Sequence, residues 1–161
     1  TTVLIRSMKI VCAANNHQIN RNSKIMTNEN ILSENSLLKP FKGIHETAPF
    51  NSIKIEYYLP AFDVAIAEAK EEVQQIIDNP EQPDFGNTIV ALDLAGERLN
   101  RIQNIFFNLN SAETCDEMQN IAQEVAPKLS DFGNDITLNE QLFARIKAVY
   151  NQRERIILIT E

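Results

Sequence analysis

The apolar residues between Leu59 and Ile77 recur at spacings of three and four, and no other feature of this chain constrains its fold as strongly. That spacing places the apolar side chains on one stripe of an α-helix. Pro60 suits the first turn of this helix, where the backbone N–H that proline lacks would have no intrahelical partner. We expect the helix to end near Asp78, because the turn-rich sequence NPEQPDFGN follows it. The predicted stripe comprises Leu59, Phe62, Ile66, Ala69, Val73, Ile76 and Ile77.

A second helix is predicted to begin around Asn87 or Thr88, either of which has a side chain suited to an N-cap, and to continue to Leu109. Ala95 and Gly96 lie in the middle of its apolar face. Such small residues permit a close helix crossing, and a hinge at Gly96 is the alternative interpretation. The predicted face comprises Ile89, Leu92, Leu99, Ile102, Phe106 and Leu109.

Two more helices follow in the sequence. The third is predicted to begin at Thr114, whose spacing from Glu117 is that of a capping box, and Asn139 is predicted to cap a fourth helix that runs toward Arg155. Only the final IILI, residues 156–159, has the composition of a strand. The apolar faces comprise Met118, Ile121, Val125, Leu129 and Phe132 in the third helix, and Leu142, Ile146 and Val149 in the fourth. The predicted fold class is therefore all-α, a bundle of about four helices preceded by an irregular N-terminal segment.

The N-terminal part of the chain has a different composition. Residues 1–35 are rich in asparagine, which favours turns over helix interiors, so we expect a flexible leader there and a helical region over residues 36–161. The segment LLKPFKGIHETAPFNSIKIEYYLPAF places prolines between isolated apolar residues. It reads as an irregular segment anchored on the core by Phe41, Phe50, Ile53 and Ile55.

Charge and hydropathy exclude several classes of function. The net charge of −7 argues against a protein that binds duplex nucleic acid. Ten acidic residues and one base lie between Glu56 and Glu97, which indicates a solvated acidic helix face or a surface for a basic partner. No apolar run approaches the roughly 20 residues that span a bilayer. Cys12 and Cys115 are far apart and form no ligand spacing, so the chain is expected in the cytoplasm, with the periplasm as the alternative.

The stretch HETAP, residues 45–49, begins like the zinc-protease motif H-E-x-x-H. Its fifth position is Pro49, which cannot bind a metal and would interrupt the helix that carries such a motif. His17, the second histidine, lies in the leader. We therefore expect no metal site in this chain.

Other candidate groups also have simple structural explanations. Cys115 lies at a predicted helix N-terminus, where the helix dipole lowers a thiol pKa, but no histidine is close in sequence to act as its base. Glu68, Glu71 and Glu72 read as one solvated helix face. Tyr57-Tyr58 and Phe106-Phe107 are expected to pack in the core, with the second ring of the Phe pair facing a neighbouring element or a docking partner.

The order of several segments resembles the N-terminal region of the thimet oligopeptidase family of zinc metallopeptidases, and most closely its bacterial peptidyl-dipeptidase members. The resemblance is carried by LLKPF, APFNSIKIEYYLPAF, NPEQPDFGNTIVALDLAGERLNRI, FFNLNSAETCDEMQ and EVAPKLSDFGNDITLNEQLFARIKAVYNQRE, which run from about Leu37 to Arg155. It implies an almost entirely helical protein that hydrolyses short peptides with one zinc, held by H-E-x-x-H and a later glutamate. It also implies that this region is part of the scaffold and not of the catalytic centre.

No catalytic or metal-binding residue of the family matches a position in this chain, and the sequence assigns no residue to substrate binding. The expected function is thus that of an N-terminal scaffold fragment, inactive alone, whose partner is the remainder of the same polypeptide. Such a fragment is expected to expose apolar faces and to self-associate through them. The alternative is a stand-alone helical module for protein interaction that is derived from the same scaffold.

Overall fold

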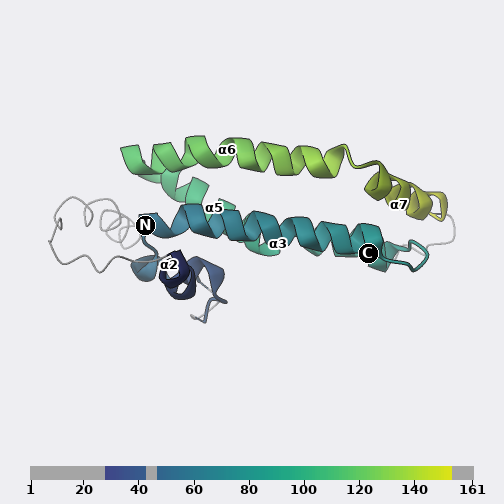
Figure 1. Cartoon of the computed structure of the whole chain (residues 1–161), viewed down its shortest axis with the longest axis horizontal. Helices are drawn as coiled ribbons and strands as arrows, with labels where there is room; N and C mark the ends of the chain where they lie inside the picture. Colours follow the sequence, from purple (N-terminus) through teal and green to yellow (C-terminus); the bar gives the residue numbers. More distant parts are fainter. Residues whose placement is uncertain (1–27, 43–46, 154–161) are drawn as a thin grey trace, which may run out of the picture.

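The structure is a computed structural model, and it describes residues 28–42 and 47–153. Over these ranges it contains helices and no strand, so the predicted all-α class is confirmed. The long helices α3 (Tyr58–Asp78) and α6 (Asp116–Thr137) run side by side along the molecule, with α5 (Glu97–Ala112) packed on α3 and α7 (Glu140–Asn151) at one end (Figure 1). Within the described ranges, no helix is both long and apolar enough to cross a bilayer. The final IILI lies outside them.

Helix α3 is the central element, since α5, α6 and α7 all contact it. Its bounds confirm the predicted start near Leu59 and the predicted end at Asp78. Ala61 and Ala65, which lie outside the predicted stripe, are fully buried in α3. Their small side chains let neighbouring helices come close to the α3 backbone. The other buried residues of α3 are Tyr58, Phe62, Ile66, Ala69, Val73 and Ile76.

Three aromatic rings form the centre of the core. Phe106 of α5 makes edge-to-face contacts with Tyr58 and Phe62 of α3, with ring centroids 4.9 and 5.5 Å apart, a geometry that favours aromatic pairs. All three rings are fully buried. The neighbouring Phe107 packs its ring against Phe106 but is partly exposed. The prediction that the two phenylalanines face different directions is therefore confirmed.

The described part of the predicted leader is helical. Helix α2 (Asn28–Glu34) precedes Asn35, whose side chain is fully buried. The Asn35 side chain accepts a hydrogen bond from the Leu37 N–H (3.0 Å) and donates one to the Tyr57 carbonyl (2.8 Å). Among the described residues, helical structure thus starts at Asn28, ahead of the boundary at residue 36 that the sequence indicates. Residues 1–27 of the predicted leader lie outside the described ranges.

The segment before α3 consists of short 3₁₀ turns: η2 (Ser36–Leu38), η4 (Phe50–Ser52) and η5 (Ile55–Tyr57). Ile53 and Ile55 are buried, and Phe50 packs against the core. Phe41 is partly buried beneath the guanidinium of Arg101, 4.5 Å from the ring centroid. Phe50, Ile53 and Ile55 are therefore confirmed as anchors on the core, whereas Phe41 packs under Arg101 instead.

The sequence predicts an N-cap for each of α6 and α7, and only the second of these predictions is correct. The predicted capping box at Thr114 is wrong, because α6 begins only at Asp116 and Cys115 occupies the N-cap position. The Thr114 hydroxyl bonds instead to the Asn110 side chain at the end of α5 (2.8 Å). The predicted Asn139 cap is confirmed, since its side-chain oxygen accepts from the Leu142 N–H (2.9 Å).

Replacing Phe106 with alanine should remove the ring on which both α3 aromatics pack, and should lower the free energy of unfolding by about 3–5 kcal/mol. Phe107→Ala is the matched control, because it removes the same side chain from a partly exposed position and should cost about 1 kcal/mol. Urea unfolding followed by circular dichroism measures both. Equal losses in the two variants would show that the core is not centred on Phe106, and Phe106→Leu serves if the alanine variant does not fold.

Two ion pairs tie α6 to α3. The Lys128 ammonium lies 2.6 Å from an Asp63 carboxylate oxygen, and the Lys70 ammonium lies 2.7 Å from an Asp135 carboxylate oxygen. The hydrogen bond to Asp63 raises the pKa of Lys128 above its usual value of 10.5, with Glu124 adding to the effect. Both pairs are exposed to solvent, so each stabilises the contact only modestly.

Lys128→Gln should lower the free energy of unfolding by about 0.5 kcal/mol at neutral pH. Because the folded state raises the Lys128 pKa, this stabilisation is complete below pH 10.5 and is lost as the pH rises through the raised value. The difference in Tm between wild type and variant should therefore vanish in strong alkali. Lys39→Gln, at an exposed lysine on a different segment, controls for the general effect of lost charge. A difference in Tm that persists in strong alkali would contradict the ion-pair explanation.

Candidate functional site

The second predicted helix is broken. It consists of a π-helical turn, η6 (Phe85–Val90), a short α4 (Ala91–Leu94) and then α5, separated by Ala95 and Gly96. The prediction of one continuous helix is wrong because Gly96 adopts a left-handed conformation, with φ of +77°, which glycine adopts with little strain. Gly96 also lies against Ala69 of α3, so the expected close approach of the two helices is present.

The predicted N-cap of this segment is also wrong. Asp84 is the N-cap, and its carboxylate accepts from the Asn87 N–H (2.7 Å) while the Asn87 side chain accepts from the Asp84 N–H (2.9 Å). Asn87 therefore contributes the returning half of a capping box and not the cap itself. Thr88 is fully buried, with its hydroxyl bonded to the Asn87 side chain (2.9 Å).

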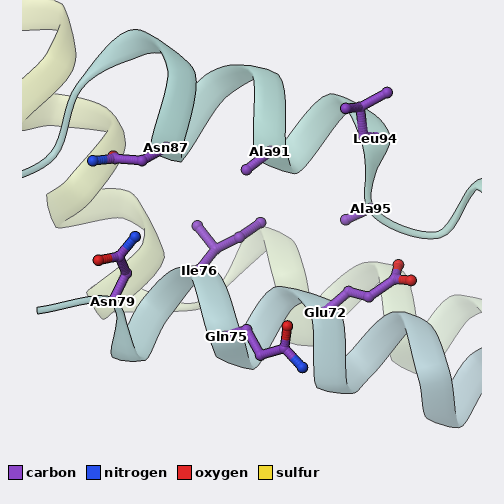
Figure 2. A pocket seen from close by; sticks show the side chains of 8 residues that line it. All are labelled: Glu72, Gln75, Ile76, Asn79, Asn87, Ala91, Leu94 and Ala95. Atoms are coloured by element: carbon purple, nitrogen blue, oxygen red, sulfur yellow. The ribbon is translucent and has the colours of Figure 1, made fainter. Parts of the chain in front are cut away.

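A groove runs between α3 and the broken helix. One part, about 350 Å³, is walled by the C-terminal half of α3 and by η6 and α4 (Figure 2). The second part, about 520 Å³, continues between α3 and the start of α5. Both parts share Glu72, Gln75 and Leu94. The two parts therefore adjoin, and the break at Gly96 lies between Ala95 of the first part and Glu97 of the second.

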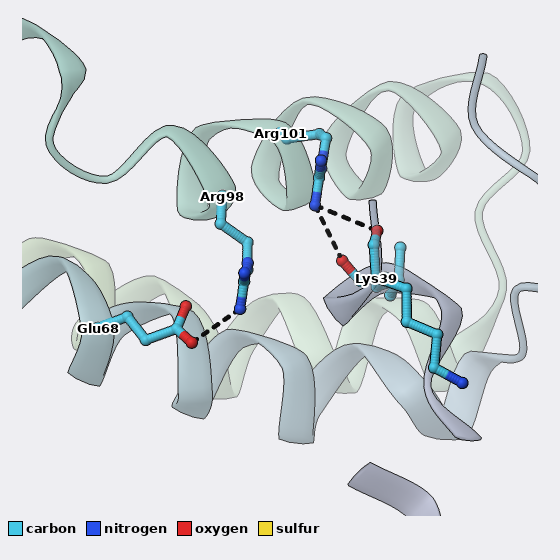
Figure 3. Close-up of polar contacts among 5 residues, drawn as sticks. Lys39, Glu68, Arg98 and Arg101 are labelled. Carbon is cyan, nitrogen blue, oxygen red and sulfur yellow. Dashed lines mark hydrogen bonds and ion pairs between the residues drawn. The ribbon is translucent and has the colours of Figure 1, made fainter. Parts of the chain in front are cut away.

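Two acidic side chains of α3 hold the wall of the groove in place. The Glu72 carboxylate accepts a hydrogen bond from the Gly96 N–H at 2.7 Å, and Glu68 forms an ion pair with Arg98 at 2.7 Å (Figure 3). The sequence places these glutamates with Glu71 on one solvated face, and Glu71 and Glu72 are indeed exposed. What the sequence does not reveal is that Glu68 and Glu72 bind the neighbouring chain segment.

Arg101 closes the far end of the groove against the N-terminal segment. Its guanidinium donates to the carbonyl oxygens of Leu37 (3.4 Å) and Lys39 (3.5 Å) (Figure 3) and stacks over Phe41. Sequence reasoning does not identify this contact, because Arg101 and Leu37 are far apart in the chain. It joins α5 to the segment that leads into α3.

Arg145 of α7 anchors the opposite end. It is buried, and its guanidinium donates to the Asn79 carbonyl (2.7 Å) and to the Asn87 side-chain oxygen (3.3 Å). Asn79 and Asn87 face each other across that end of the groove (Figure 2). The sequence holds one signal for this role, since Arg145 lies on the apolar face of α7 between Leu142 and Val149.

The structure does not assemble the other candidate groups into a reactive site. Cys115 is partly buried at the N-cap of α6 and packs on the core, while His17 and His45 lie outside the described ranges. Pro49, at the fifth position of HETAP, precedes the turn η4 and offers no ligand atom. In residues 28–42 and 47–153, no three His, Cys, Asp or Glu side chains are placed to hold a metal ion. The residues that line the groove can bind and position polar groups through carboxylate, amide and guanidinium hydrogen bonds.

The break at Gly96 can be tested with a pair of glycines. Gly96→Ala should lower the free energy of unfolding by about 1–2 kcal/mol, because an L-residue is strained in the left-handed region. Gly133→Ala, in the interior of α6 with open space around the added methyl group, should stabilise the protein by about 0.5–1 kcal/mol. Urea unfolding measures both changes. A stabilising Gly96→Ala would instead favour the continuous helix that the sequence predicts.

Comparison with known proteins gives related sequences over most of this chain. Dipeptidyl carboxypeptidase of Escherichia coli is 41% identical over 112 residues, which cover 70% of this chain and 16% of that protein. Dipeptidyl carboxypeptidase of Salmonella typhimurium is 37% identical over 81% of this chain and 19% of that protein. Oligopeptidase A of Haemophilus influenzae is 28% identical over 74% of this chain and 17% of that protein.

No family model matches the chain. It spans less than a fifth of the length of the curated relatives that it matches. The relatives nevertheless have the names of the two kinds of peptidase that the sequence motifs indicate. This chain therefore belongs, over most of its length, to the thimet oligopeptidase family.

Proposed function

We propose that residues 36–161 are the N-terminal helical scaffold of a zinc-dependent peptidyl-dipeptidase and are not catalytic alone. One observation carries this proposal. The chain is 41% identical to a dipeptidyl carboxypeptidase over 70% of its own length but covers only 16% of that protein. The catalytic residues of the parent enzyme are then supplied by other parts of a longer polypeptide, which acts on short peptides.

The chemistry of the described residues supports a scaffold role. The polar side chains of the groove bind backbone groups of neighbouring segments: Glu72 the Gly96 N–H, Arg101 the Leu37 carbonyl and Arg145 the Asn79 carbonyl. Such contacts fix the relative positions of helices. The zinc of the parent enzyme does not fit this donor set, since the residues that line the groove include no histidine or cysteine. In HETAP, the position of the second histidine of H-E-x-x-H is occupied by Pro49.

The partner in this proposal is the remainder of the same polypeptide. Exposed apolar side chains beside the groove supply a surface for it, namely Phe85, Val90 and Leu94. Large exposed apolar groups that lie near one another mark interaction surfaces more often than free surface.

The proposed location is the cytoplasm, with the periplasm as the alternative, and this proposal rests on the sequence alone. Neither nucleic acid nor a membrane is proposed as a partner.

The purified chain should bind no stoichiometric zinc after dialysis against the metal, and it should release no dipeptides from a short peptide with a free C-terminus. Elemental analysis measures the bound metal, and chromatography measures the released dipeptides. Dipeptidyl carboxypeptidase of Escherichia coli serves as the positive control in the same assay. Dipeptide release that a chelator abolishes would overturn the proposal.

The alternative is a stand-alone helical interaction module derived from the same scaffold. It is favoured by the strongly exposed apolar residues of α7, Phe143 and Tyr150. Reading the encoding DNA past the codon for Glu161 separates the two functions. An open frame that leads to H-E-x-x-H and a later glutamate supports the scaffold, whereas a natural stop codon at that point supports the module.

A further inference from the structure

The outer face of α7 carries a regular set of exposed side chains that the bundle does not use. Glu140, Phe143, Lys147 and Tyr150 are spaced by three, four and three residues, so they lie on one side of the helix. All four are exposed. The buried residues of the same helix, on another side, are Leu142, Arg145 and Val149.

The apolar members of this face are unusually open to solvent. Phe143 is 62% exposed and Tyr150 is 63% exposed. Within the described part of the chain, neither Glu140 nor Lys147 forms an ion pair. The guanidinium of Arg153, just past the end of α7, lies over the Tyr150 ring, 4.4 Å from its centroid. The face therefore combines Phe143, the edge of Tyr150 and two oppositely charged side chains, Glu140 and Lys147, that are available to a partner. Figure 1 shows α7 at the opposite end of the molecule from α2.

We propose that this face binds the same face of a second copy of the chain, with the two α7 helices antiparallel around a two-fold axis close to Phe143. In that arrangement, Phe143 meets Phe143 of the second copy. Glu140 meets Lys147 of the second copy, and the reverse pair forms on the other side of the axis. One alignment of the two antiparallel helices brings all of these pairs together, to within one residue.

The arrangement of charges favours a second copy over an unrelated partner. A two-fold interface requires a surface that is complementary to itself. Glu140 and Lys147 satisfy that requirement, because they have opposite charges and lie on either side of Phe143 at nearly equal separations. A parallel pairing of the two helices would instead bring like charges together.

The size of the face sets the expected strength of binding. Helix α7 has 12 residues, so its length is about 18 Å at ~1.5 Å per residue. A contact along one such helix is smaller than the ~800 Å² per partner of a standard interface. The dimer is therefore weak and reversible, with a Kd between about 10 µM and about 1 mM. It does not depend on the function proposed above.

The test is sedimentation equilibrium of the full chain at low salt, over concentrations from about 10 µM to about 1 mM. The wild type should show a reversible monomer–dimer equilibrium that weakens as salt is added. Glu140→Lys and Lys147→Glu should each raise the Kd about tenfold or more, because each places like charges at two symmetric contacts. The double variant, with Glu140→Lys and Lys147→Glu together, should restore the wild-type Kd, because opposite charges then meet again. Only this alignment of the two helices explains such a restoration.

A matched pair of apolar variants tests whether dimerisation depends on this face or on exposed apolar side chains in general. Phe143→Ser should raise the Kd about tenfold or more, whereas Leu94→Ser should leave it unchanged, although Leu94 on α4 is equally exposed at 62%. Circular dichroism melts confirm that each variant is folded. The proposal is overturned by a wild type that stays monomeric at the highest concentration, by a double swap that fails to restore binding, or by equal effects of the two serine variants. Each of these results would leave the face to a different partner, such as the remainder of a longer polypeptide.

Discussion

The burial of one stripe of α3 against its neighbours holds the structure together. The Tyr58, Phe62 and Phe106 rings form the aromatic centre of this contact, and α5, α6 and α7 all pack on the same helix. Burial of large apolar side chains is the dominant favourable term in folding, and each such ring contributes about 2–3 kcal/mol. The exposed ion pairs between α3 and α6 add orientation more than stability.

The polar groove is a consequence of this arrangement. Gly96 interrupts the second helix where it passes α3, and the Glu72 carboxylate binds the backbone N–H at the break. Two arginines fix the ends of the groove. Arg101 of α5 binds the N-terminal segment, and Arg145 of α7 binds the end of α3. All three contacts join a charged side chain to a main-chain group, which positions the backbone itself.

The proposed supporting role rests on the similarity to peptidases and on the chemistry of the described residues. The relatives are several times longer than the matched region. The groove and the outer face of α7 are separate surfaces with different chemistry. The groove is lined by carboxylates, amides and arginines, whereas the α7 face carries two aromatic rings, an acid and a base.

Short-range patterns in the sequence determined the helical class, the extent of α3 and the cap at Asn139, because periodicity and capping depend on residues within a few positions of each other. The anchoring role of Ile53 and Ile55 was predictable for a similar reason, since isolated apolar residues in a polar segment have one favourable place to go. The sequence also held a signal for Arg145 in the apolar face of α7, although it did not identify the partners of that side chain.

Only the tertiary structure decided the break at Gly96, the start of helical structure at Asn28, and the contacts of Arg101 and Arg145. Each depends on groups far apart in the chain, as when Asn35 bonds to the Tyr57 carbonyl or Glu72 to the Gly96 N–H. A glycine within an apolar stripe is compatible with both a continuous and a broken helix. The choice is made by whether a distant carboxylate is placed to satisfy the backbone that the break exposes.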